Sequence, residues 1–229
     1  MGEFRNYEVN GIKLYKSDFN TEWIDKYLGE KPKVIIEFGS YDGGDGAFYK
    51  QKYPDCMVFS LEACFERYTI IKENEKLLGI DVSNFAVCEY DGFVQFYPVK
   101  DPNVMDSLDK YGSSGSINKR TDMYKQKFLH IVEQNPVEVK SIRIDTFCKL
   151  KDIKSIDFLH VDVEGAEHRV IEGFGSMRPK IIWMETCLGK DYYGDNAYDI
   201  NQLNTSIINM GYSIVEETNS DTLYLYDNN

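Results

Sequence analysis

One stretch decides the fold of this protein: Val34-Ile35-Ile36-Glu37-Phe38-Gly39-Ser40-Tyr41-Asp42-Gly43-Gly44-Asp45-Gly46. Its first part, residues 33–38, is an apolar run rich in β-branched residues, which is typical of a buried parallel strand. Four glycines follow within eight residues, and residues 47–50 can begin a helix. A strand, a glycine-rich turn and a helix predict a nucleotide-binding corner, because glycine lets a ligand approach main-chain N–H groups.

The spacing of the glycines argues against a dinucleotide. The pattern Gly-x-Gly-x-x-Gly fails after Gly44 and Gly46, because Tyr49 takes the third glycine position. Glu37 at the end of the strand would repel a pyrophosphate but suits a ligand with an amino group. S-adenosylmethionine (SAM) carries such a group and no phosphate, so the stretch favours SAM. The alternative is a strand followed by an ordinary glycine turn, since short motifs also occur by chance.

Composition limits the class of protein. A chain of 229 residues fits one α/β domain, with residues 1–30 as an N-terminal arm and helix. The net charge of −12 argues against nucleic acid as partner and favours a small-molecule or saccharide acceptor. Five scattered cysteines without a Cys-x-x-Cys pair predict reduced thiols in a cytoplasmic protein. No apolar run approaches the length of a membrane span.

Strand and helix patterns alternate along the chain. Alternation predicts a single Rossmann-like, doubly wound α/β fold with a mostly parallel sheet and helices on both faces. We expect strands at 33–38, 56–61, 82–87, 93–97, 137–144, 156–162, 180–185, 212–217 and 222–226, the last two as a C-terminal antiparallel hairpin. We expect helices at 21–28, 47–52, 63–78, 165–173 and 199–210, with a short one from residue 145.

Three further segments of this scheme are expected to form a hairpin strand or a loop. The segment 93–97 is expected to form a hairpin with 82–87 through Asp91-Gly92. Residues 99–120 are rich in Gly, Ser, Asp and Asn, and a long loop inside a compact domain predicts a lid or substrate loop. Residues 190–198 are expected to form a polar loop.

Four expected strands end in an acidic residue: Glu37, Glu62, Asp162 and Glu185. In an open α/β sheet, ligands bind beyond the carboxyl ends of the strands, so these four acids are expected at one site. Glu62 lies 23 residues beyond Gly39, where an acid accepts hydrogen bonds from both ribose hydroxyls. From the same order of strand ends we also predict that residues 84–86 lie near the adenine of SAM.

His160, Asp162 and Glu164 stand at positions i, i+2 and i+4, which would share one face if the strand continued. They could form a base with its orienting acid, or a metal site. The structural alternative is that Glu164 caps the next helix and Glu167 stabilises its positive end.

These motifs resemble class I methyltransferases of the FkbM type. That family's Asp-x-Gly-Ala-Asn-x-Gly motif is similar to residues 37–43, although Ser40-Tyr41 replaces Ala-Asn. Its most specific block, [Lys/His]-x-Asp-x-Glu-Gly-x-Glu, matches residues 160–167. A glutamate after the second strand corresponds to Glu62, but Ala63 stands where the family usually has proline. The resemblance covers about residues 33–186. It implies SAM-dependent O-methylation, often of sugar or natural-product hydroxyls.

Two sets of site residues are therefore expected. The cofactor would be bound by Glu37, Gly39, Ser40, Tyr41, Gly43, Glu62, Ala63, Asn84, Phe85, Ala86 and Asp162. The acceptor proton would be removed by His160 or Asp162 without a metal, with Glu185 orienting the base. The alternative is a divalent ion such as Mg²⁺ shared by Asp162 and Glu185. Other candidate functions are a nucleotide-dependent sugar oxidoreductase and a non-catalytic interaction module with the same fold.

Overall fold

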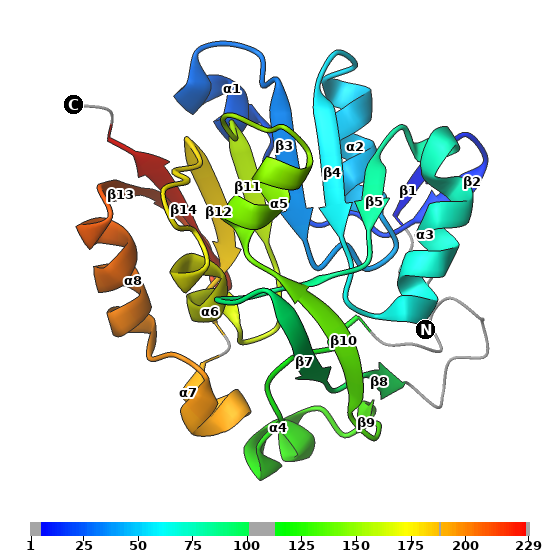
Figure 1. The fold of residues 1–229 in the computed structure, drawn as a ribbon, viewed down its shortest axis with the longest axis vertical. Coiled ribbons are helices and arrows are strands. Elements are labelled where there is room, and N and C mark those ends of the chain that lie inside the picture. Colours follow the sequence, from blue (N-terminus) through cyan, green and yellow to red (C-terminus); the bar gives the residue numbers. More distant parts are fainter. Residues whose placement is uncertain (1–5, 101–112, 188, 228–229) are drawn as a thin grey trace.

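The computed structural model describes residues 6–100, 113–187 and 189–227. Its centre is a seven-stranded sheet in the order β13-β14-β12-β11-β3-β4-β5 (Figure 1). The strands are β3 (Val34–Phe38), β4 (Met57–Leu61), β5 (Asp81–Ser83), β11 (Phe158–Val161), β12 (Ile181–Glu185), β13 (Tyr212–Glu217) and β14 (Asp221–Tyr226). The five strands from β12 to β5 run parallel. β14 runs antiparallel to β12, and β13 pairs antiparallel with β14 at the edge of the sheet. The expected doubly wound sheet with a C-terminal hairpin is confirmed.

Helices cover both faces of this sheet (Figure 1). One face packs against α1 (Glu22–Leu28), α2 (Gly44–Lys52) and α3 (Phe65–Leu78), through a core that includes Ile35, Phe158 and Trp183. The other face packs against α5 (Ile144–Leu150), α6 (Glu167–Glu172) and α8 (Ile200–Asn209), through a core that includes Ile36 and Leu159. Because neighbouring strand residues point to opposite faces, each buried strand contributes side chains to both cores.

A small second sheet lies beside the carboxyl ends of the main strands. Its order is β6 (Ala86–Val87), β10 (Val137–Ile142) and β7 (Gly92–Phe96), with β10 in the middle. The expected single strand at 82–87 and its hairpin with 93–97 are therefore wrong. Asn84 donates hydrogen bonds to the carbonyl oxygens of Glu62 (2.7 Å) and Ala63 (3.1 Å), and the chain leaves the main sheet there. The sequence around β6 and β7 could not show that β10, from a distant part of the chain, would insert between these two strands.

The remaining elements are short. The expected N-terminal arm is a hairpin of β1 (Tyr7–Val9) and β2 (Ile12–Leu14). The expected polar loop at 190–198 instead holds α7 (Lys190–Tyr193) and the 3-10 helix η1 (Gly194–Asn196). The helix α4 (Asp122–Lys127) and the strands β8 (Val99–Lys100) and β9 (Val132–Glu133) were not expected.

Part of the expected loop at 99–120, residues 101–112, lies outside the residues that the structure describes. Within the described ranges, no helix is both long enough and apolar enough to cross a membrane. In Figure 1 the arrowheads of β4 and β12 point towards the part of the chain that holds β7, β10 and α4. The carboxyl edge of the main sheet therefore faces the small sheet, and this arrangement builds the candidate site.

Candidate functional site

A cavity with about 620 Å³ of open space lies between the two sheets. Its polar and small residues on the main-sheet side include Gly39, Glu62, Arg67 and Asp162. The facing wall comes from β7 and the segment after the omitted residues: Phe96, Pro98, Val99, Ser113, Gly115, Ser116 and Ile117. Apolar side chains fill the floor: Phe38, Leu61, Phe85, Val87 and Val163.

Gly39 lets two loops meet at the floor of the cavity. It has φ +81°, and a Cβ at this position would come within 1.7 Å of the carbonyl oxygen of Asp162. The turn after β3 and the turn after β11 are therefore in backbone contact. Gly39 therefore serves the close approach of two main-chain segments, and its expected contact with the cofactor stays a prediction.

Glu62 is buried, with 6% of its surface exposed, and is held by two main-chain groups. The amides of Tyr41 and Cys64 donate hydrogen bonds of 2.9 and 2.8 Å to its two oxygens. Burial raises the pKa of Glu62, while these amides and the charge of Arg67 oppose the rise. Each oxygen keeps a further lone pair, so the carboxylate is fixed and can still accept hydrogen bonds from a ligand in the cavity.

Arg67, in the first turns of α3, is a site residue that sequence analysis missed. Its guanidinium carbon lies 3.7 Å from the centre of the Tyr41 ring, and Nη1 donates a 3.4 Å hydrogen bond to the Tyr41 carbonyl. The side chain is 2% exposed, yet Nε and Nη2 have no hydrogen-bond partner among the described residues. Buried donors without partners are rare in proteins, so a cavity ligand is their natural acceptor.

The other expected cofactor residues divide into two groups. Ala63, Phe85 and Ala86 line the cavity as expected. Ser40, Tyr41, Gly43, Asn84 and Glu37 are not among the lining residues. Asn84 fixes the turn after β4, as described above, and Gly43 with φ +81° begins α2. Glu37 points to the opposite face of the sheet, where Ser60 donates a 2.7 Å hydrogen bond to it.

Asp162 lines the cavity and stands in a group of carboxylates. Desolvation by the surrounding protein, together with the charges of Glu164 and Glu167, raises the pKa of Asp162 well above its ordinary value. Burial and the charge of Asp162 raise the pKa of Glu185 in the same way. The expected pair is thus brought within electrostatic reach. Asp162 and Glu185 are not part of any group of three close potential ligand side chains among the described residues.

His160 lies apart from the cavity, on the face covered by α2. It is 6% exposed, and its Nδ1 is 3.1 Å from the hydroxyl of Tyr49. Strand β11 ends at Val161, and Glu164 has φ +55°. The expected common face of His160, Asp162 and Glu164 therefore does not form, because the strand ends too early.

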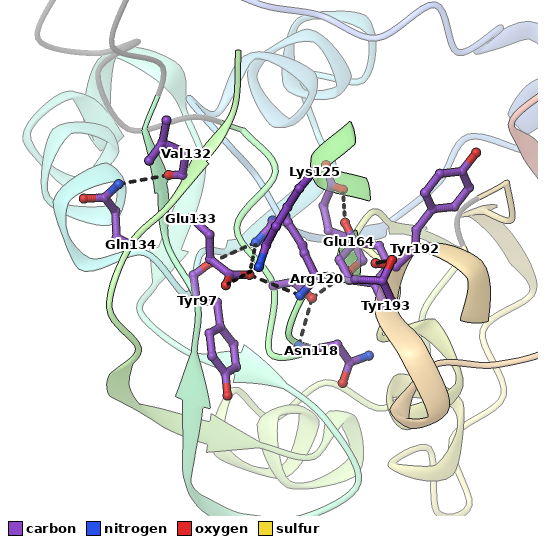
Figure 2. Close-up of polar contacts among 12 residues, drawn as sticks. Tyr97, Asn118, Arg120, Lys125, Val132, Glu133, Gln134, Glu164, Tyr192 and Tyr193 are labelled. Atoms are coloured by element: carbon purple, nitrogen blue, oxygen red, sulfur yellow. Dashed lines mark hydrogen bonds and ion pairs between the residues drawn. The ribbon is translucent and has the colours of Figure 1, made fainter. Parts of the chain in front are cut away.

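The loop wall of the cavity is tied to the turn after β11 (Figure 2). Ser116 donates a 2.7 Å hydrogen bond to the carbonyl of Glu164, and Asn118 donates one of 2.8 Å to the carbonyl of Gly165. Tyr193 of α7 donates a 2.7 Å hydrogen bond to the Glu164 carboxylate. The described C-terminal part of the loop expected at 99–120 is thus attached to the turn after β11.

Arg120 supports this wall from behind (Figure 2). Its side chain is 1% exposed and lies 3.5 Å from the carboxylate of Glu133. Its guanidinium carbon is 4.9 Å from the ring centre of Tyr124 and 5.7 Å from that of Tyr193. The pKa of Arg120 is raised; burial acts against this rise, while the two tyrosines and Glu164 cause it. Arg120 therefore stays charged and joins α4, α7 and β9 into one support.

Comparison with known proteins gives one family match and several relatives. A family model described as a methyltransferase FkbM domain matches residues 37–214. The chain is 28% identical to the 2-O-methyltransferase NoeI of Sinorhizobium fredii over 167 residues, covering 72% of this chain and 67% of that protein. It is 25% identical to methyltransferase 1 of Beauveria bassiana over 183 residues, covering 75% and 72%. A solved O-methyltransferase from Bacillus cereus, in complex with SAH, shares 10% identity and a TM-score of 0.45, covering 92% and 83%.

Proposed function

We propose, given that this chain belongs to the FkbM family of SAM-dependent methyltransferases, that it methylates a hydroxyl oxygen of a sugar or glycoconjugate. The observation that carries the proposal is the position of Glu62 and Asp162 on opposite sides of Gly39 in one cavity. Glu62 suits the ribose of the cofactor, and Asp162 lies where an acceptor can be deprotonated. O-methylation is supported by the name of the relative NoeI.

The residues of the cavity fit SAM. Glu62 offers acceptor atoms for two hydroxyls, and Phe85 and Ala86 offer an apolar surface for a flat base. Arg67 has two donors without partners at the same end. Gly39, which also lines the cavity, lets the turn after β3 and the turn after β11 meet beside the cofactor. When bound, SAM supplies an electrophilic methyl group on a sulfonium.

The protein must position the acceptor oxygen and take its proton. Asp162 lines the cavity, and its raised pKa makes its carboxylate a stronger base than an ordinary aspartate. Burial and the charge of Asp162 raise the pKa of Glu185, so Glu185 would act on the base electrostatically. His160 is too far inside the opposite face to touch an acceptor in this arrangement, so we assign the proton to Asp162.

The acceptor would enter from the side of the loop wall. Ser113, which is exposed, and Gly115 present small groups there, and the Ser113 hydroxyl suits a polar, hydroxyl-bearing molecule. Natural-product hydroxyls are the second candidate, because the same family resemblance includes them. The net charge of −12 favours an acceptor without phosphates in either case.

Mass spectrometry on purified protein tests the proposal. The protein is incubated with SAM and a panel of free monosaccharides, oligosaccharides and phenolic or polyketide alcohols. We expect a gain of one methyl group on a saccharide, and no product from the Asp162→Asn variant. Methylation of only the non-sugar alcohols would show that the acceptor is a natural product and not a saccharide. Calorimetry that shows SAM and SAH binding but no turnover of any acceptor would instead favour a non-catalytic module.

A further inference from the structure

A second polar cluster lies behind the glycine turn, on the face of the sheet that the cavity does not use. It consists of Glu37 at the end of β3, Asp45 in the first turn of α2 and His160 in β11. One potential ligand atom of each lies within 4.8 Å of the others. Glu37 and His160 are neighbours across the parallel strand pair, so the sheet itself sets their separation. None of the three lines the cavity.

We propose that Glu37, Asp45 and His160 bind one divalent transition-metal ion, such as Zn²⁺ or Mn²⁺. Two ligand atoms on opposite sides of an ion with bonds of about 2.0–2.4 Å are about 4.0–4.8 Å apart. The observed spacing therefore admits a single ion between the three side chains. Two carboxylates and one imidazole match the mixed oxygen and nitrogen ligands that these metals accept.

The three side chains are held apart by other partners. Ser60 donates to Glu37 (2.7 Å), Ser17 donates through its hydroxyl to Asp45 (2.8 Å), and the Tyr49 hydroxyl lies 3.1 Å from Nδ1 of His160. Among the described residues, no hydrogen bond or ion pair joins Glu37, Asp45 and His160 directly. Ligands that are oriented from outside, with space left between them, are the usual arrangement of a metal site.

The cluster has no lysine or arginine partner in the described part of the chain. Burial lowers the pKa of His160, against the opposing effect of Asp45 and Asp221. Burial and the charge of Asp45 raise the pKa of Glu37 well above its ordinary value. Neither carboxylate forms an ion pair with a lysine or arginine within the described part of the chain. A divalent ion would balance both carboxylates.

The cluster is enclosed by protein. His160 is 6% exposed and Glu37 is 2% exposed. Gly46 lies against the cluster, and a Cβ there would come within 3.0 Å of Glu37 Oε2 and 2.6 Å of Ser60 Oγ. An ion bound here would join β3, β11 and the start of α2. It would therefore stabilise the glycine turn without contacting the reacting atoms.

Metal titration of the full chain tests this inference independently of methyl transfer. The protein is treated with a chelator, dialysed, and titrated with Zn²⁺, Mn²⁺ or Mg²⁺ in a calorimeter, and its unfolding midpoint is measured with and without each ion. We expect one equivalent of Zn²⁺ or Mn²⁺ per chain and a higher midpoint, because an ion that binds only the folded state stabilises it. Mg²⁺ should bind much more weakly, since imidazole is a poor ligand for it.

Four variants locate the site. Asp45→Asn should abolish binding, and Tyr49→Phe should weaken it roughly 10- to 100-fold, as loss of an outer partner usually does. His160→Lys should fold without metal and bind none, because its ammonium can take the place of the ion. Asp162→Asn, in the cavity, should bind metal like the wild type. Absence of binding to the wild type overturns the proposal, and so does binding that survives Asp45→Asn or is lost in Asp162→Asn.

Discussion

The carbonyl oxygen of Asp162 occupies the space beside Gly39 where any other residue would carry its Cβ, at a distance of 1.7 Å. The glycine-rich turn and the acidic turn therefore depend on each other for their position. Gly39 also has φ +81°, which L side chains rarely adopt. The contact with the Asp162 carbonyl and the positive φ both disfavour any other residue at position 39. Experiment can separate the two effects.

Gly39→Ala should lower the free energy of unfolding by about 2–4 kcal/mol, because main chain must move to admit the methyl group. Urea unfolding measures the change. Gly11→Ala is the matched control, because Gly11 has the same φ of +81° but no other atom within 4 Å of the added Cβ. Equal losses in the two variants would show that only the dihedral angle matters.

Glu62→Gln should weaken SAM binding by about 1–3 kcal/mol, through loss of charge-assisted hydrogen bonds to the ribose. Isothermal titration calorimetry with SAM and SAH gives the affinity. Glu73→Gln, an exposed position on α3, is the control and should bind like the wild type. Unchanged affinity in a folded Glu62→Gln protein would remove Glu62 from the cofactor site.

Arg67→Met should lower both stability and binding. The free energy of unfolding is expected to fall, because buried Glu62 loses the positive charge beside it and Tyr41 loses its stacking partner. SAM affinity should fall roughly 10- to 100-fold, since hydrogen bonds from a charged donor are lost. Arg67→Lys keeps the charge but not the planar set of donors, and should recover only part of the affinity. A Met variant that binds SAM normally would show that these donors do not reach the cofactor.

Asp162→Asn should lower kcat roughly 100-fold or more, as removal of a general base usually does. The raised pKa of Asp162 also predicts the shape of the pH profile. The base works only when deprotonated, so wild-type kcat should begin to fall, as pH decreases, well above the ordinary aspartate value of 3.8. Rates measured across pH, with the variant as baseline, test both statements. An acid limb that persists in the variant would belong to another group.

Glu167→Gln should change how stability depends on pH. Burial raises the pKa of Glu167 from 4.5 to about 8 in the folded protein. Between these values the folded state keeps a proton that the unfolded chain has lost, so rising pH destabilises the wild type by up to about 1.4 kcal/mol per unit. The variant lacks this effect and should be relatively more stable at pH 9 than at pH 4. Denaturant unfolding at both values measures the difference, and parallel curves would contradict it.

Sequence reasoning predicted the main sheet because each of its strands is a local signal. Apolar runs such as residues 34–38 and 181–185 become strands wherever helices cover both faces, and their last residues then meet at one edge. At that edge, a shift of one residue along the strand reverses the face to which a side chain points. Glu37 and Asp162 were both predicted from strand ends, yet one faces α2 and the other faces the cavity.

Other site features depend on contacts that are distant in the sequence. Arg67 is a single arginine in a helix, and no pattern distinguishes it until the cavity beside it is known. Tyr193 reaches Glu164 from a segment that was expected to be a loop. The small sheet depends on β10 inserting between two strands that are near each other in sequence. Local propensity carries no information about such insertions.

The two hydrogen bonds that hold the loop wall end on main-chain carbonyls, those of Glu164 and Gly165. A carbonyl is present whatever the side chain is, so these attachments require only a donor at positions 116 and 118. Exposed positions of this wall, such as Ser113 and Lys119, can change without breaking the two attachments. A gene duplicate could therefore acquire a new acceptor by changing this loop, while the cofactor end of the cavity stays under its original selection.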